Sequence, residues 1–325
     1  MGVTAQRPRK VLISGAGGFI GRALRRRLAA SGIPFVAAMR KLSSEDAAAP
    51  ECVALGDFAA ADWEQVLAGV DAVVHLAGLA QLPREHAGDA TPYVVANVHV
   101  TRRLLTAASR AGVRRIVLAS TIKVYGETTA RGRPFRAGDP AQPRDDYART
   151  KEQAEKVLWQ ICDAAGMEGV VLRLPLTYGP GVTGNFLALL EAVAARRWLP
   201  LAGLANRRSL LYVRNAAAAI EASLTAPALA GETLPVADAQ SVSTSELVRR
   251  IARAFGVTAR LYYVPAALLR AGALSTGRRG AASRLLGSLE VDPTRFGELA
   301  HWTPTATLDE GLAATAAWWR LRHTL

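Results

Sequence analysis

The stretch SGAGGFIG, Ser14–Gly21, follows the apolar run KVLIS and leads into a helical pattern over Phe19–Ala30. It places Gly15, Gly18 and Gly21 at three-residue spacing. Glycines in such a strand-to-helix turn let the backbone approach a diphosphate closely, and the N-terminus of the helix offers unpaired N–H groups. The stretch therefore predicts a dinucleotide-binding turn at the start of an α/β sheet.

The segments that follow alternate between apolar runs and helical patterns. The runs read PFVAAM, ECVAL, DAVVHLA, RRIVLAS and GVVLRL, with helices expected near residues 93–111 and 147–165. This order is typical of a doubly wound parallel sheet, a Rossmann fold, with helices on both faces.

The alternation ends after Leu174, where the Gly/Pro-rich stretch PLTYGPGVTGN begins. We therefore expect an NAD(P)-binding Rossmann domain over 1–174 and a smaller, mainly substrate-binding domain over 175–325. A segment near 208–225 is expected to return to the first domain. The cleft between two such domains is the expected ligand site.

Bulk composition narrows the class of protein. The chain has 325 residues, half of them hydrophobic, and contains neither a signal-peptide pattern nor a run of about eighteen uncharged apolar residues. Its two cysteines form no spaced metal-binding set. These features predict a cytoplasmic protein without membrane insertion and without a metal site.

The formal net charge of +13 raises the question of an anionic partner. The basic residues are spread along the chain as pairs such as Arg196–Arg197 and form no basic tail or patch interleaved with aromatic residues. We therefore expect an anionic small molecule as the ligand and no nucleic acid.

The second apolar run bears on the choice of dinucleotide. FVAAMRK ends in Arg40 and Lys41, where NAD-binding sheets usually carry an acid for the ribose 2′-hydroxyl. A basic residue there suits a 2′-phosphate, so NADP(H) is favoured over NAD(H), although an arginine can also stack on adenine. Asp57, in LGDF after the third run, is a candidate adenine contact, and the alternative is a plain turn residue.

The reacting groups are expected where the later strands end. IVLASTIKVYG delivers Ser120 and Thr121 to a carboxyl end of the sheet, and YARTK places Tyr147 and Lys151 one helical turn apart. A nearby ammonium and an oxidised nicotinamide both favour a phenolate, which can exchange a proton with an alcohol or carbonyl oxygen. The alternative is a cation and an aromatic ring that merely share a helix surface.

Taken with GAGGFIG, HLAG, RLPLTYGPG, GNF, RRSLLYV and the tail HWTPTATLDEGLAATAAWW, these motifs resemble a known family over nearly the whole length. The chain is similar to extended short-chain dehydrogenase/reductases of the NAD-dependent epimerase/dehydratase family, and to its UDP-glucose 4-epimerase-like group. The resemblance implies a nucleotide-sugar substrate and a homodimer formed through helices near 91–111 and 146–166.

The resemblance also implies roles for individual residues. Tyr147 would be the acid/base, Lys151 would bind the nicotinamide ribose and lower the tyrosine pKa, and Thr121 would orient the substrate oxygen. Asn185 and Arg208 would face the substrate diphosphate, with Lys123 a further candidate substrate contact. The expected cofactor contacts are Gly15, Gly18, Phe19, Ile20, Gly21, Arg40, Asp57, Phe58, Ala77, Gly78, Tyr147, Lys151 and Pro175.

Several activities share this scaffold. A 4,6-dehydratase would need an Asp–Glu pair directly after Thr121, but Ile122 and Lys123 stand there. A UDP-hexose 4-epimerase would retain NAD⁺, whereas Arg40 and the STIKVYG stretch favour an NADPH-dependent reductase of UDP-4-keto-6-deoxy-N-acetylhexosamines in surface-polysaccharide pathways. Reduction is therefore predicted ahead of epimerisation. A non-catalytic NADP(H) sensor is disfavoured because Thr121, Tyr147 and Lys151 are all present.

Overall fold

The computed structural model describes residues 7–81, 88–265, 267–269 and 286–323. Their centre is a seven-stranded sheet in the order β10-β6-β5-β4-β1-β2-β3, with every neighbouring pair parallel. The strands span β1 (Val11–Ser14), β2 (Phe35–Met39), β3 (Cys52–Ala54), β4 (Ala72–His75), β5 (Arg115–Thr121), β6 (Glu168–Leu174) and β10 (Glu232–Pro235). The predicted doubly wound sheet is confirmed.

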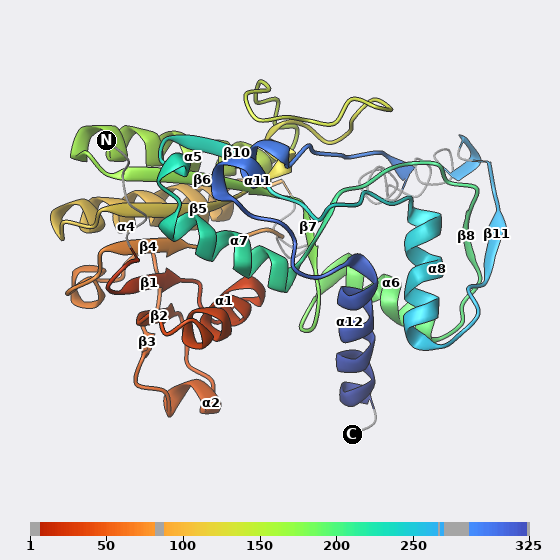
Figure 1. Cartoon of the computed structure of the whole chain (residues 1–325), viewed down its shortest axis with the longest axis horizontal. Helices are drawn as coiled ribbons and strands as arrows, with labels where there is room; N and C mark the ends of the chain where they lie inside the picture. Colours follow the sequence, from red (N-terminus) through yellow and green to blue (C-terminus); the bar gives the residue numbers. More distant parts are fainter. Residues whose placement is uncertain (1–6, 82–87, 266, 270–285, 324–325) are drawn as a thin grey trace.

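Helices cover both faces of this sheet (Figure 1). One buried cluster joins α1 (Phe19–Ala30), α7 (Val213–Thr225) and α11 (Thr294–Ala300) to one face. A second cluster joins α4 (Val100–Arg110) and α5 (Asp146–Ala165) to the other. Shorter elements are α2 (Ser44–Ala47), α3 (Thr91–Tyr93) and 3₁₀ turns at Glu64–Val66, Ile122–Val124 and Pro227–Leu229.

Helix α5, which carries the YARTK motif, has well-defined ends. Asp145 is its N-cap, and the carboxylate accepts a hydrogen bond of 2.8 Å from the Ala148 N–H. Gly166 ends the helix in the left-handed conformation with φ 65°. Both are typical helix boundaries, so the position of Tyr147 in the first turn follows from the local sequence.

The rest of the chain forms a smaller part beside the sheet (Figure 1). Two short parallel pairs occur there, β7 (Leu176–Tyr178) with β9 (Leu210–Tyr212) and β8 (Leu199–Ala202) with β11 (Leu261–Tyr263). The helices are α6 (Gly184–Ala194), α8 (Thr244–Phe255) and α12 (Leu308–His323), which share a third buried cluster.

The two parts are interleaved along the chain. Helix α7 packs on α1, and β10 then extends the central sheet by pairing with β6. The chain that returns to the sheet thus runs on to Pro235, beyond the expected segment near 208–225. The division at residue 174 stays a prediction.

A buried polar chain links the centre of the sheet to the helix beside it. Ser14 Oγ and His75 Nδ1 are 2.5 Å apart, and His75 Nε2 lies 2.8 Å from Thr101 Oγ1. The Thr101 hydroxyl donates to the Asn97 carbonyl, so His75 must donate from Nε2 and accept from Ser14 at Nδ1. Burial lowers the pKa of His75 to about 3, with Lys151 adding to the effect, and the ring is neutral.

Within the described ranges no helix is long and apolar enough to cross a membrane. The same ranges hold no group of three or more His, Cys, Asp or Glu side chains placed to hold a metal ion.

Candidate active site

The glycine turn between β1 and α1 is closely packed. Gly15 has φ +74°, and a Cβ there would lie 2.7 Å from the backbone nitrogen of Ala77. A Cβ at Gly21 would overlap the Gly15 carbonyl oxygen. Gly18 is the N-cap of α1, has no side chain over the first N–H groups, and is followed by no acid in the first turn. This turn fits the diphosphate of a dinucleotide, which places an anion at the positive end of the helix dipole.

Phe19 and Ile20 follow the turn, and both were expected to contact the cofactor. Their half-buried side chains pack against the apolar cluster of the smaller part. These two residues would therefore contact a phosphate through their backbone N–H groups at the start of α1.

The end of β2 carries the residues expected to select the dinucleotide. Arg40 and Lys41 directly follow this strand, and both side chains are exposed. In the part of the chain that the structure describes, Arg40 makes no ion pair or hydrogen bond with another side chain. An exposed guanidinium of this kind can donate two parallel hydrogen bonds to a ribose 2′-phosphate.

The loop after β3 is more constrained. Asp57 Oδ1 accepts a 3.0 Å hydrogen bond from the Ala59 N–H, which makes an Asx-type turn. Phe58 is buried and its ring packs on Trp63 with centroids 5.0 Å apart. The side chain of Phe58 thus belongs to the core, and only its backbone can serve a cofactor.

The carboxyl end of β4 brings several predicted residues together. A Cβ at Gly78 would lie 2.8 Å from Asn97 Oδ1 and 3.8 Å from Lys151 Nζ. The approach of Asn97 therefore requires a glycine at this position, whereas the distance to Lys151 would be an ordinary contact. Ala77 is buried against the glycine turn, and Pro175 is buried directly after β6. These positions form the expected floor for a nicotinamide riboside.

Asn97 was not identified from the sequence. It lies in a π-helical segment, Val94–His99, between α3 and α4. Its Oδ1 accepts from the Leu79 N–H at 2.8 Å, and its Nδ2 donates to the Leu79 carbonyl at 3.1 Å and to Thr150 Oγ1 at 3.0 Å. Asn97 therefore ties the loop after β4 to α5, next to Lys151. Single π turns within α-helices often occur at functional sites.

Thr121, Tyr147 and Lys151 meet at the carboxyl edge of the sheet. Thr121 is the last residue of β5 and is buried. Tyr147 lies in the first turn of α5 and is hydrogen-bonded to the Thr121 side chain, and Lys151 follows one turn later. A hydroxyl, a phenol and an ammonium so placed can hold a substrate oxygen and exchange a proton with it.

The two titratable groups are shifted in opposite directions. Burial raises the pKa of Tyr147 to about 12; the hydrogen bond from Thr121 opposes this, while Asp145 and Tyr93 add to it. Burial lowers the pKa of Lys151 to about 8, and the Glu155 carboxylate opposes that shift. Burial in the protein therefore keeps Tyr147 a phenol. A cationic neighbour is needed to bring its pKa towards neutral pH.

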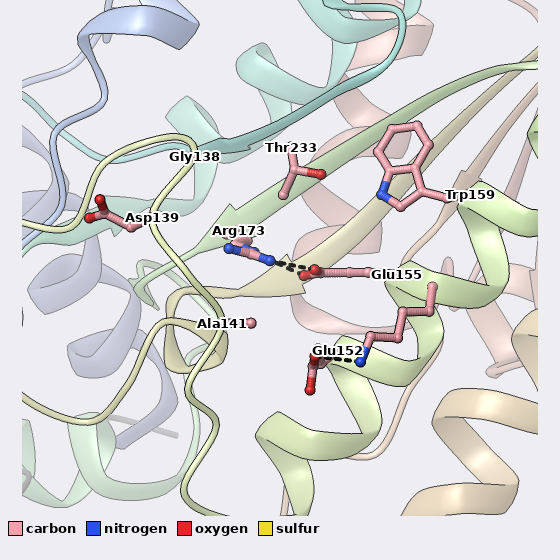
Figure 2. Close-up of a pocket in the computed structure, with 9 residues that line it drawn as sticks. Gly138, Asp139, Ala141, Glu152, Glu155, Trp159, Arg173 and Thr233 are labelled. Carbon is pink, nitrogen blue, oxygen red and sulfur yellow. Dashed lines mark hydrogen bonds and ion pairs between the residues drawn. The ribbon is translucent and has the colours of Figure 1, made fainter.

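A buried ion pair joins β6 to α5 (Figure 2). Arg173 donates to both carboxylate oxygens of Glu155, at 3.1 and 2.6 Å. Ser120, the residue before Thr121, donates to the same carboxylate. The Arg173 guanidinium also lies 4.2 Å from the ring centroid of Tyr125. This network connects β5, β6 and α5, and it includes the residue before Thr121 and the residue one helical turn after Lys151.

The cavity drawn in Figure 2 has a volume of about 260 Å³ and lies between α5 and the loop at 138–141. Its lining includes Glu155 and Arg173 but neither Thr121, Tyr147 nor Lys151. It is therefore separate from the place where these three residues meet.

The three predicted substrate contacts have different surroundings. Lys123 forms ion pairs with Asp145 and Glu127. Asn185 is exposed in the first turn of α6. The half-buried Arg208 donates to the Gly287 carbonyl at 3.0 Å. Lys123 is thus anchored to the start of α5, and contact with substrate stays a prediction for all three.

Comparisons with known proteins find similar sequences over most of the chain. Residues 11–237 match the model of the NAD dependent epimerase/dehydratase family. A UDP-glucose 4-epimerase of Vibrio cholerae is 33% identical over 314 residues, covering 95% of each chain. A dTDP-glucose 4,6-dehydratase of Streptomyces griseus is 31% identical and covers 95% of this chain and 93% of its own.

Solved structures are similar over nearly the whole chain. MoeE5 in complex with UDP-glucose and NAD has a TM-score of 0.79 at 26% identity, covering 97% of this chain and 99% of that one. A UDP-N-acetylglucosamine 4-epimerase from Bacillus cereus has a TM-score of 0.76 at 20% identity, covering 96% and 99%, and shows the same fold.

Proposed function

The chain belongs to the NAD-dependent epimerase/dehydratase family, and on that premise we propose that it transfers hydride between a nicotinamide dinucleotide and C4 of a UDP-sugar. The observation that supports this most directly is the meeting of Thr121, Tyr147 and Lys151 beside Gly78, at the sheet edge that faces the glycine turn. The direction we propose is reduction of a UDP-4-keto-6-deoxy-N-acetylhexosamine.

The residues of this chain would divide the work as follows. Thr121 holds the C4 oxygen, and Tyr147 gives that oxygen its proton as the ketone becomes an alcohol. Lys151 supplies a positive charge that opposes the effect of burial on the tyrosine. The bound dinucleotide supplies the hydride.

The preference for NADP(H) rests on Arg40. It lies exposed at the end of β2, where a ribose 2′-phosphate would be met by a guanidinium instead of an acid. An exchangeable NADPH suits a reductase, which consumes one reductant per turnover.

Dehydration has little support in the site. Ile122, directly after Thr121, is buried, and the next side chain, Lys123, is engaged by Asp145 and Glu127. The position after Thr121 thus presents no carboxylate to remove a C5 proton.

Epimerisation at C4 is the second candidate, because a relative 33% identical over 95% of the chain is named UDP-glucose 4-epimerase. The same three residues would serve it, with NAD⁺ retained between the two hydride transfers.

The deciding experiment is to denature freshly purified protein and identify the released nucleotide and its stoichiometry by mass spectrometry. Empty protein, or protein carrying NADP(H), supports the reductase. Its activity is then tested with a UDP-4-keto-6-deoxy-N-acetylhexosamine and NADPH deuterated at the transferable position. Deuterium should appear at C4 of the product. Stoichiometric NAD⁺, together with interconversion of UDP-hexoses without added nucleotide, would instead establish the epimerase.

The predicted homodimer and cytoplasmic location stay predictions. The mass in solution, measured by light scattering, tests the first.

A further inference from the structure

A group of aromatic side chains lies exposed at the outer edge of the smaller part. Among the described residues, six large hydrophobic side chains are exposed. Three of them belong to the β8–β11 pair and its start: Trp198 at 63%, Tyr262 at 46% and Tyr263 at 69% exposed. A fourth, Leu268 at 63%, follows β11. Isolated exposed apolar residues are ordinary, but a cluster of aromatic residues marks an interaction site.

The cluster is held together by contacts among its own members. Trp198 and Tyr262 meet edge to face, with ring centroids 6.5 Å apart, and the Arg260 guanidinium lies 5.8 Å from the Trp198 centroid. Tyr263 packs over Gly203, where a Cβ would lie 2.9 Å from the ring. The rings of Trp198, Tyr262 and Tyr263 are thus held by contacts with their neighbours, while much of their surface is exposed to solvent.

Arginines flank the cluster. Arg196 and Arg197 directly precede Trp198, Arg260 directly precedes β11, and all three are exposed. These guanidiniums give the edge a positive potential toward a surface that meets it.

Figure 1 shows where this edge lies in the molecule. The β8–β11 pair is at the extreme end of the smaller part, away from the glycine turn and β5. A flat partner could therefore reach it without obstruction by the central sheet.

We propose that the β8–β11 edge docks on an anionic lipid surface. Tryptophan and tyrosine favour the membrane–water interface, where the ring is buried among headgroups and the polar atom stays wet. Arginines beside them pair with the headgroup phosphates, and each adds to the attraction by an anionic leaflet. The attachment is peripheral and does not depend on the reaction proposed for Thr121, Tyr147 and Lys151.

A nucleic acid shares the phosphate chemistry but fits the cluster less well. Stacking platforms for bases need open aromatic faces. Although Trp198 is exposed, the Arg260 guanidinium lies over its ring and Tyr262 contacts the same ring at an interplanar angle of 64°, so these two side chains share the surface on which a base would stack.

The test is co-sedimentation of the full chain with phosphatidylcholine vesicles, with and without phosphatidylglycerol. Wild-type protein should sediment with the anionic vesicles at low ionic strength and be released by high salt. The double variant Arg196→Ser/Arg197→Ser should lower the partition coefficient roughly tenfold or more, because each arginine contributes substantially at such a surface. Trp198→Ser should weaken it as well.

A matched control uses another pair of exposed arginines. Arg131→Ser/Arg133→Ser, in the loop before Phe135, removes the same charge and should leave most of the binding intact. Equal losses in the two double variants would mean attraction by net charge alone and would overturn the proposal. The proposal would also be overturned if the wild-type protein did not bind the anionic vesicles, or if the Arg196/Arg197 and Trp198 variants lost only the binding of an oligonucleotide. It would likewise be overturned if the mass in solution showed that the aromatic cluster is buried between two copies of the chain.

Discussion

Glu155 lies one helical turn after Lys151 on α5, and both side chains are buried. The carboxylate is fixed by Arg173 and Ser120, so its charge stays close to the ammonium. It is the group that opposes the lowering of the Lys151 pKa by burial. Glu155 is therefore a positioning residue for the proposed chemistry, acting through Lys151.

Glu155→Gln should shift the alkaline limb of the activity profile. Lys151 acts as an ammonium, so activity falls as pH rises through its pKa of about 8. Without the carboxylate that pKa falls further, and the limb should move down by about one pH unit. The measurement is kcat/KM for hydride transfer against pH. Glu152→Gln, which removes the carboxylate that forms an ion pair with Lys156, should leave the limb in place.

Loss of Glu155 also leaves Arg173 without its buried partner, which costs stability on the order of 3 kcal/mol. A variant that is destabilised but keeps the wild-type pH profile would show that Glu155 is purely structural.

Lys151→Met should stabilise the protein near neutral pH while abolishing turnover. The folded pKa of about 8 lies below the ordinary value of 10.5, so the folded state disfavours the ammonium. That cost, on the order of 3 kcal/mol, is fully present below pH 8. It fades between pH 8 and 10.5, because the unfolded chain then holds the extra proton and stability rises with pH.

Urea unfolding at several pH values measures this difference. The advantage of Lys151→Met should shrink across the same pH interval. Lys156→Met, at an exposed ion pair, should change stability by less than about 1 kcal/mol at any pH. A methionine variant less stable than wild type at pH 7 would contradict the prediction.

Tyr147→Phe should retain nucleotide binding and lose turnover. The phenol is the proton donor of the proposed reduction, and general acid catalysis contributes roughly a hundredfold to ten-thousandfold. Calorimetric binding of NADPH and the rate of its oxidation report the two effects separately. Tyr262→Phe, on β11, serves as the control for loss of a hydroxyl. Full activity in Tyr147→Phe would exclude the assigned role.

Arg40→Asp should reverse the cofactor preference. An acid at this position repels a 2′-phosphate and accepts hydrogen bonds from a 2′-hydroxyl, so the ratio of Kd values for NADPH and NADH should change by roughly tenfold or more. Arg26→Ser, on the exposed side of α1, should leave the ratio unchanged. Equal binding of both dinucleotides by wild type would remove the basis for an NADP(H) preference.

Gly15→Ala should be far more damaging than Gly56→Ala, although both glycines have positive φ, +74° and +64°. An alanine at either position pays about 1 kcal/mol for that conformation. At Gly15 the methyl group also meets the backbone of Ala77, whereas nothing lies within 4 Å at Gly56. Chemical unfolding compares the two. Similar losses would mean that the turn relaxes without cost.

Local sequence signals predicted the sheet and the turn that begins it. The apolar runs and the glycine spacing depend on neighbours in the chain, and the structure confirms the fold that they indicate. Asn97 was missed because VVANVH reads as continuous helix. Its importance comes from contacts with Leu79 and Thr150, which are remote in sequence.

The sequence also contained no sign of the ion pair formed by Lys123, whose contact with substrate stays a prediction. This pair with Asp145 joins groups 22 residues apart and depends on the loop between them. Spacing alone carries no information on such a partner.

The pairing of β10 with β6 has a consequence for synthesis of the chain. The central sheet includes β1, which begins at Val11, yet its outer strand ends only at Pro235. Until that strand leaves the ribosome, β6 has an open edge with unpaired N–H and C=O groups, which is a template for association with other chains. The nascent chain therefore cannot complete the central sheet before β10 is synthesised. We expect it to depend on a chaperone between the synthesis of β6 and that of β10.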